Sequence, residues 1–142
     1  MANFLKISAK YRVTTPYMVG YHLLILVCVV LIIGYLFEFI RIGFIVRLYP
    51  DFYYHVSNLC ISIIFYAGIG LAWITSGVKF RYIVLLGGMM IGANVVCETV
   101  MSFMNTTDFT DAVYGVIGVV IGFVYLAMIY KNGLTPLEES FL

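Results

Sequence analysis

Four long apolar stretches, separated by short polar segments, dominate the pattern along this chain. They predict helices over residues 16–37, 52–76, 82–104 and 109–130. Each stretch approaches or exceeds the roughly 20 apolar residues with which a helix crosses about 30 Å of hydrocarbon. We therefore expect an all-α membrane protein with four transmembrane helices. The segments between the helices are too short for a separate domain, so residues 1–142 should form one bundle.

Residues that favour helix ends flank these stretches. Thr15 and Asp51 are the N-cap candidates of the first and second helices. Gly77 can close the second helix. Asp108 or Asp111 suits the positive end of the dipole of the fourth helix.

The segment between the first two helices stays apolar, but charges interrupt it at Glu38, Arg41 and Arg47. Such a stretch is typical either of an amphipathic helix that lies along the membrane interface or of an extension of the first helix. Glu38 and Arg41 are three residues apart and can pair on one helical face.

Composition supports the same class. The chain is 63% hydrophobic and only 11% charged, with a mean hydropathy of +1.06. A soluble domain would carry about 25% charged residues, because water surrounds it on every side. The formal net charge of +1 and the lack of a long basic stripe argue against a nucleic-acid partner.

Basic residues predict the orientation in the membrane. Six lie on one side of the predicted helices and two on the other: Lys6, Lys10, Arg12, Lys79, Arg81 and Lys131 against Arg41 and Arg47. The positive-inside rule then puts both termini in the cytoplasm. The loop from residue 105 to 111 should therefore face outward.

Polar side chains form a line on the third predicted helix. Their spacings are four, four and three residues, in the order Asn94, Glu98, Ser102 and Asn105. Residues at these spacings share one helical face. A polar face is costly against lipid, so we expect it to turn toward protein. Asn58, Ser62 and Tyr66 give the second helix a similar face.

Small residues form a stripe on the fourth predicted helix, where Gly115, Gly118 and Gly122 follow Asp111 at helical spacing. Such stripes let another backbone approach closely. We interpret these glycines as helix-packing positions. A tight hairpin of the third and fourth helices is the simplest arrangement.

Ionisable residues at membrane depth usually mark function. If the polar faces turn inward, charged and polar groups gather in the outer half of the bundle. The ligand-binding candidates are Glu98, Asp108, Asp111, Asn94, Arg41 and His55.

Signals of catalysis are weak by comparison. Paired acids could serve acid–base or metal chemistry, but the chain has no His and Cys ligand spacing and no G-x-S-x-G turn. We therefore expect no catalytic residues, no metal and no cofactor. Cys28, Cys60 and Cys97 lie inside predicted helices without a C-x-x-C pair, which indicates reduced packing cysteines.

The stretch from Asn94 to Lys131 resembles the C-terminal signature of VanZ-like membrane proteins. The resemblance rests on Glu98, Asp108 and Asp111, followed by Gly118 and Gly122 at seven and eleven residues after Asp111. The chain differs at Met101 and Gly115, where that family usually has Gln and Asn. The resemblance implies a small bacterial envelope protein of four-helix type, with those five residues as the positions of interest and no defined reaction.

Two functional hypotheses follow. The first is a VanZ-like protein of the bacterial inner membrane, surrounded by membrane lipids, whose outward acidic pocket binds a lipid headgroup, another amphiphile or a cationic ligand. The second is a small transporter, channel or pore that forms a homo-oligomer through its glycine faces, because four short helices alone enclose little space.

Overall fold

The computed structural model describes residues 9–100 and 108–137, apart from the side chains of residues 39, 99 and 100. Four long helices make up most of the fold: α1 (Thr15–Leu36), α3 (Phe52–Thr75), α4 (Phe80–Val100) and α5 (Phe109–Asn132). All four are long and apolar enough to cross a membrane. The prediction of four such helices is confirmed. The predicted residues 101–104 of the third helix lie outside the described part of the chain.

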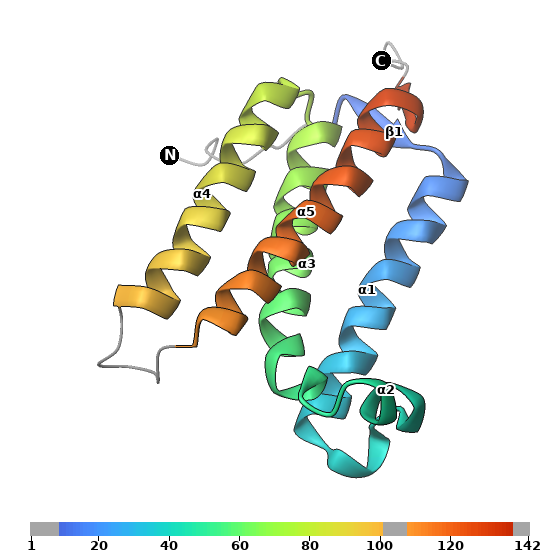
Figure 1. Cartoon of the computed structure of the whole chain (residues 1–142). Helices are drawn as coiled ribbons and strands as arrows, with labels where there is room; N and C mark the ends of the chain where they lie inside the picture. Colours follow the sequence, from blue (N-terminus) through green and yellow to red (C-terminus); the bar gives the residue numbers. More distant parts are fainter. Residues whose placement is uncertain (1–8, 101–107, 138–142) are drawn as a thin grey trace, which may run out of the picture.

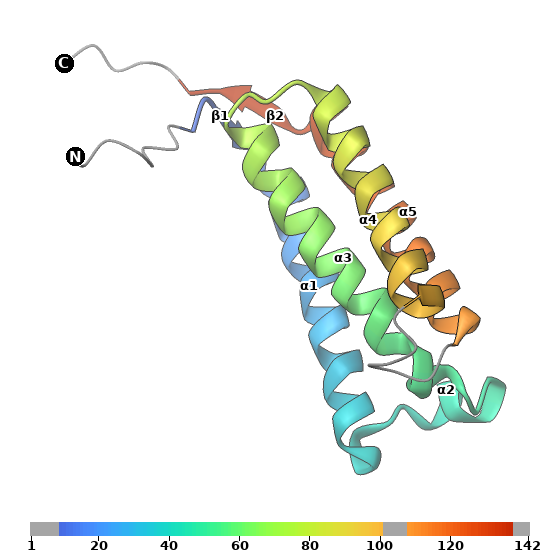
Figure 2. The same cartoon turned by 90° about the vertical axis from the view of Figure 1, so that its left-hand side faces the viewer.

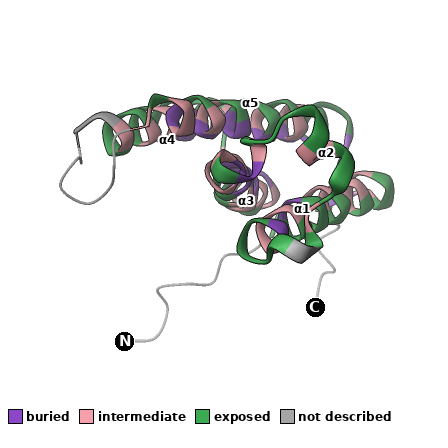
Figure 3. Ribbon diagram, turned by 60° about the horizontal axis from the view of Figure 1, so that its bottom comes forward, coloured by how far each residue is buried: buried purple, intermediate pink, exposed green. Residues whose placement is uncertain are grey.

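The helices pack as an open row in which α3 and α5 form the central pair (Figure 1). α1 packs on α3, and α4 packs on α5 and more lightly on α3. Figure 3 shows α3 between α5 and α1, with buried residues of α5 facing α3. About half of the residues of α1 and more than half of the described residues of α4 are exposed in the isolated chain, which suits helices that face lipid.

Two three-residue strands join the chain ends, and the all-α prediction missed them. β1 (Tyr11–Val13) pairs antiparallel with β2 (Leu134–Pro136). Runs this short carry no readable periodicity, so the sequence pattern could not reveal them. The strands lie at the end of the bundle where α3 connects to α4 (Figure 2). This arrangement places the first and last described residues on one side of the helices.

The helix ends follow the sequence only in part. Gly77 closes α3 with a φ of 81°, a conformation that favours glycine. Asp108 caps α5 by accepting a hydrogen bond from the backbone N–H of Thr110. The N-cap of α1 is Thr14 and not Thr15, and Asp51 makes no side-chain capping bond at the start of α3.

The segment between α1 and α3 is neither an extension of α1 nor one continuous helix. The chain leaves α1 at Phe37 and forms a 3-10 turn, η1 (Glu38–Ile40), followed by the short helix α2 (Gly43–Leu48). α2 lies at the end of the bundle away from the strands (Figures 1 and 2).

Two groups of buried side chains hold the bundle together. One, between α3, α4 and α5, includes Tyr66, Leu126 and Ile129. The other joins α1 to α3 and includes Cys28 and Cys60, which are buried and form no disulfide. Buried apolar side chains therefore fill the bundle both toward the strands and toward α2.

Candidate functional site

Acidic and imidazole side chains from three helices meet at the end of the bundle opposite the β-strands. His55 comes from the first turn of α3, Glu98 from the last turn of α4, and Asp108 and Asp111 from the start of α5. Glu98 reaches this end of α3 through Asn58, which follows His55 by one turn and whose Nδ2 lies 3.5 Å from Oε1 of Glu98. We call His55, Glu98, Asp108 and Asp111 the acidic cluster.

His55 is the centre of the acidic cluster. Its Nδ1 lies 2.8 Å from Oδ1 of Asp111 and 3.7 Å from Oδ2 of Asp108. The side chains of His55 and Asp111 are only 14% and 18% exposed, whereas Asp108 is 41% exposed. The cluster is therefore enclosed on the side of α3 and open toward solvent at Asp108.

Tyr114 lies beside the imidazole, with ring centroids 5.5 Å apart. Sequence reasoning did not select this residue. Its position three after Asp111 was the available signal, because that spacing puts both on one side of a helix. Tyr114 limits the positions that the His55 ring can adopt.

Asp108 is held in its ionised form by the start of α5. The backbone N–H of Thr110 donates to its carboxylate at 2.8 Å. That bond, together with the hydroxyl of Thr110 and the nearby charge of His55, lowers the pKa of Asp108 below its ordinary value of 3.8. Asp108 therefore carries a negative charge at neutral pH.

Three polar contacts connect successive turns of α3 to α4. Asn58 Nδ2 lies 3.5 Å from Oε1 of Glu98, and the Asn94 amide nitrogen donates to the Ser62 hydroxyl at 3.2 Å. One turn further in, the Tyr66 hydroxyl donates to the carbonyl of Ile83 at 2.9 Å. The polar faces predicted on these two helices therefore face each other.

Glu98 is incompletely satisfied by these contacts. Its Oε1 has the long contact to Asn58, whereas its Oε2 is inaccessible to solvent and has no hydrogen-bond partner among the described residues. A carboxylate oxygen left in this way is costly, because it loses water without gaining a donor. The side chain turns toward protein and keeps an acceptor atom that no described residue uses.

The glycine stripe of α5 brings this helix close to two neighbours. A Cβ at Gly115 would meet the side chain of Asn94 on α4, and one at Gly118 would meet the backbone oxygen of Leu59 on α3. Gly122 lies against Tyr66 on α3. The stripe thus packs mainly on α3, not only within the expected hairpin of α4 and α5.

Arg41 does not join the acidic cluster in the described part of the chain. It pairs with Glu38 at 3.4 Å, its Nε donates to the carbonyl of Gly34, and its guanidinium lies over the rings of Tyr53 and Tyr54. The structure therefore does not bring Arg41 to the acidic cluster, because the chain leaves α1 at Phe37, and the prediction that Arg41 binds a ligand stays a prediction. Ser102 and Asn105, also predicted on the polar face, lie outside the described residues.

The acidic cluster has an excess of negative charge. It contains three carboxylates and one imidazole, and among the described residues no Lys or Arg forms an ion pair with any of them. The donor atoms of His55, Asp108 and Asp111 all lie within 4.8 Å of one another. Chemically, such a group can bind a cation, either a metal ion or an ammonium group.

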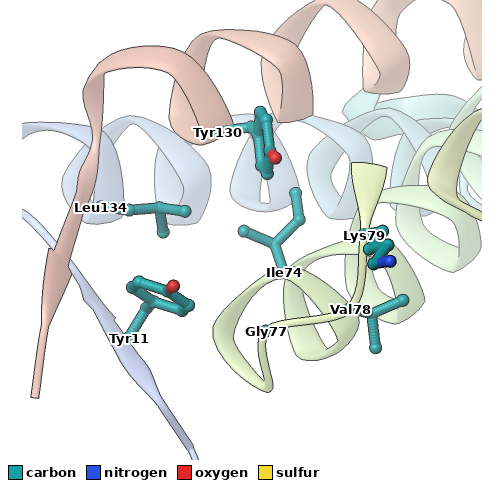
Figure 4. Close-up of a pocket in the computed structure, with 7 residues that line it drawn as sticks. All are labelled: Tyr11, Ile74, Gly77, Val78, Lys79, Tyr130 and Leu134. Atoms are coloured by element: carbon teal, nitrogen blue, oxygen red, sulfur yellow. The ribbon is translucent and has the colours of Figure 1, made fainter. Parts of the chain in front are cut away.

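A separate hollow of about 360 Å³ lies at the opposite end, beside the β-strands (Figure 4). Tyr11, Ile74, Gly77, Val78, Lys79, Tyr130 and Leu134 line it. None of the predicted ligand residues lies there, so it is distinct from the acidic cluster.

Comparisons with protein families, with curated proteins and with solved structures find no match for this chain. The resemblance to VanZ-like proteins therefore rests on the sequence motif alone.

Proposed function

We propose that this chain is a VanZ-like integral membrane protein whose acidic cluster binds the positively charged headgroup of an amphiphile at the outer face of a bacterial inner membrane. The outward orientation follows from the positive-inside distribution of Lys and Arg. The proposal is for a binding protein and not for an enzyme.

One observation carries the proposal: Oε2 of Glu98, in the acidic cluster, is inaccessible to solvent and has no hydrogen-bond donor among the described residues. A ligand ammonium group would supply both the missing N–H donor and the missing positive charge. Hydrogen bonds to charged groups contribute about 1.5–3 kcal/mol each. An amphiphile suits this position, because Glu98 ends an apolar helix and a bound headgroup would leave its chain in the lipid.

A second candidate, an oligomeric transporter or pore, is favoured by the surface of α4. Gly88 and Gly92 on this helix have open space where a Cβ would lie. Small residues four apart are typical of helix–helix contacts in membranes. Against a pathway through one copy, Tyr66, Leu126 and Ile129 fill the core beyond the cluster.

Binding of dodecylammonium to the full chain in phosphatidylcholine nanodiscs tests the first proposal. We expect saturable binding that Glu98→Gln weakens by about 10- to 100-fold, since one charge-assisted hydrogen bond is lost. Dodecyltrimethylammonium has the same charge but no N–H, so it should bind more weakly than dodecylammonium. Native mass spectrometry gives the stoichiometry and the number of chains per particle.

Glu38→Gln is the matched control. It removes a carboxylate from the same end of the bundle, but the Glu38 side chain is 81% exposed and is not part of the acidic cluster. It should leave dodecylammonium binding unchanged. Equal effects of the two substitutions, or no saturable binding at all, would contradict the proposal. A stable ring of chains would favour the pore instead.

A further inference from the structure

We propose that His55, Asp108 and Asp111 bind a divalent transition-metal ion such as Zn²⁺. This inference rests on the proposed function in that it takes the acidic cluster to be a ligand site, and it names a second ligand there. The metal site uses three residues of the cluster, while Glu98 remains available to the ammonium group.

The distances between donor atoms fit a metal ion. Zinc bonds of about 2.0–2.1 Å in tetrahedral geometry place two ligand atoms about 3.3 Å apart. His55 Nδ1 lies 2.8 Å from one Asp111 oxygen and 3.7 Å from one Asp108 oxygen, on either side of that value. All three donor atoms lie within 4.8 Å of one another. Small side-chain rotations would bring them around one ion.

The donor set indicates which ions fit. One imidazole nitrogen with two carboxylates suits Zn²⁺, Fe²⁺ or Mn²⁺ better than Ca²⁺ or Mg²⁺, which prefer oxygen ligands alone. A double positive charge would also balance the two aspartates, which have no Lys or Arg partner among the described residues. Three protein ligands leave a coordination position open, as in zinc sites that bind a further molecule.

The site has a rigid side and an open side. Tyr114 packs against the His55 ring, and the N-cap bond from Thr110 fixes Asp108. The 41% exposure of Asp108 provides an entry path for an ion from solvent. Preorganised ligands and an entry path are the features expected of a functional metal site.

Linear spacing did not reveal these ligands. His55 and Asp111 are 56 residues apart and meet only because α3 and α5 pack together. The prediction of no metal relied on His and Cys spacing, which identifies only sites with ligands close in sequence.

Zinc titration of the full chain in phosphatidylcholine nanodiscs, after removal of metals with a chelator, tests this inference. Isothermal titration calorimetry should show one zinc ion per chain. His55→Gln and Asp111→Asn should each lower the affinity by about 100-fold or more, since loss of an outer partner alone costs 10- to 100-fold. His22→Gln is the matched control, because His22 is the other histidine of the chain and lies on α1, bonded to Met18. It should bind zinc like the unmodified chain.

Asp108→Asn separates a loss of zinc binding from a loss of folding. Asn caps a helix about as well as Asp, but it is a weaker metal ligand. We expect the variant to keep its helix content and to bind zinc more weakly. Absence of saturable zinc binding, or unchanged affinity in the His55, Asp108 and Asp111 variants, would overturn the metal site. If dodecylammonium binding still depends on Glu98 in those samples, only the metal inference fails. If zinc binds and dodecylammonium does not, only the proposed function fails.

Discussion

Replacing Gly118 with alanine tests the close packing of α5 on α3, which positions the acidic cluster. The new Cβ would contact the backbone oxygen of Leu59 and lie 3.0 Å from Cβ of Ser62, whereas ordinary contact begins at 3.4 Å. Neither neighbour is the end of a flexible side chain, so α5 must move away by about 1 Å. A gap of that size removes a quarter to a half of the dispersion energy of each affected contact.

The expected cost follows from two opposing effects. Overpacking costs about 1–3 kcal/mol, and the higher helix propensity of alanine returns at most about 1 kcal/mol. We predict that Gly118→Ala lowers the free energy of unfolding by about 1–2 kcal/mol. The shift should also lengthen the 2.8 Å contact between His55 and Asp111, because Asp111 lies two turns before Gly118 on the same helix.

Denaturant unfolding in detergent micelles measures this cost. Trp73, the single tryptophan, packs against the core formed by α3, α4 and α5 and reports on unfolding through its fluorescence. Gly92→Ala is the matched control, since nothing lies within 4 Å of its new Cβ. It should be neutral or slightly stabilising. Equal stability of Gly118→Ala and the unmodified chain would refute the close packing of α3 and α5.

Two further predictions concern other parts of the bundle. Oxidation with copper phenanthroline should link Cys28 to Cys60 within one chain, because both free thiols are buried in the same cluster between α1 and α3. Peptide mass spectrometry would identify the link, and a fully oxidised sample without it would contradict that packing. Asp108, whose pKa is lowered in the fold, should stabilise α5 fully above its ordinary pKa of 3.8 and lose this effect as the pH falls through the native pKa. Thermal unfolding against pH should therefore show a steeper acid loss in the unmodified chain than in Asp108→Asn, and identical profiles would contradict the cap.

The long helices could be predicted from sequence because hydropathy and length decide them directly. The polar faces of α3 and α4 were also readable, since Asn58, Ser62, Asn94 and Glu98 follow helical spacing and lipid is a poor solvent for them. The packing of α1 and of α5 on α3 could not be predicted from the sequence, because several arrangements of the four helices bury the same faces.

The site was predictable only as a set of residue types. Glu98, Asp108, Asp111 and His55 were identified from their cost at membrane depth, but the contact between His55 and Asp111 depends on tertiary packing. Arg41 was misplaced, because its stacking on Tyr53 and Tyr54 depends on the turn after α1. The β-strands were missed because three residues give too little pattern.

The central claim is that Glu98, whose Oε2 has no donor among the described residues, binds an ammonium group. A dodecylammonium titration of the unmodified chain, Glu98→Gln and Glu38→Gln in nanodiscs tests it most directly. We predict affinity that falls about 10- to 100-fold in Glu98→Gln alone. Equal affinity in all three proteins would contradict the claim.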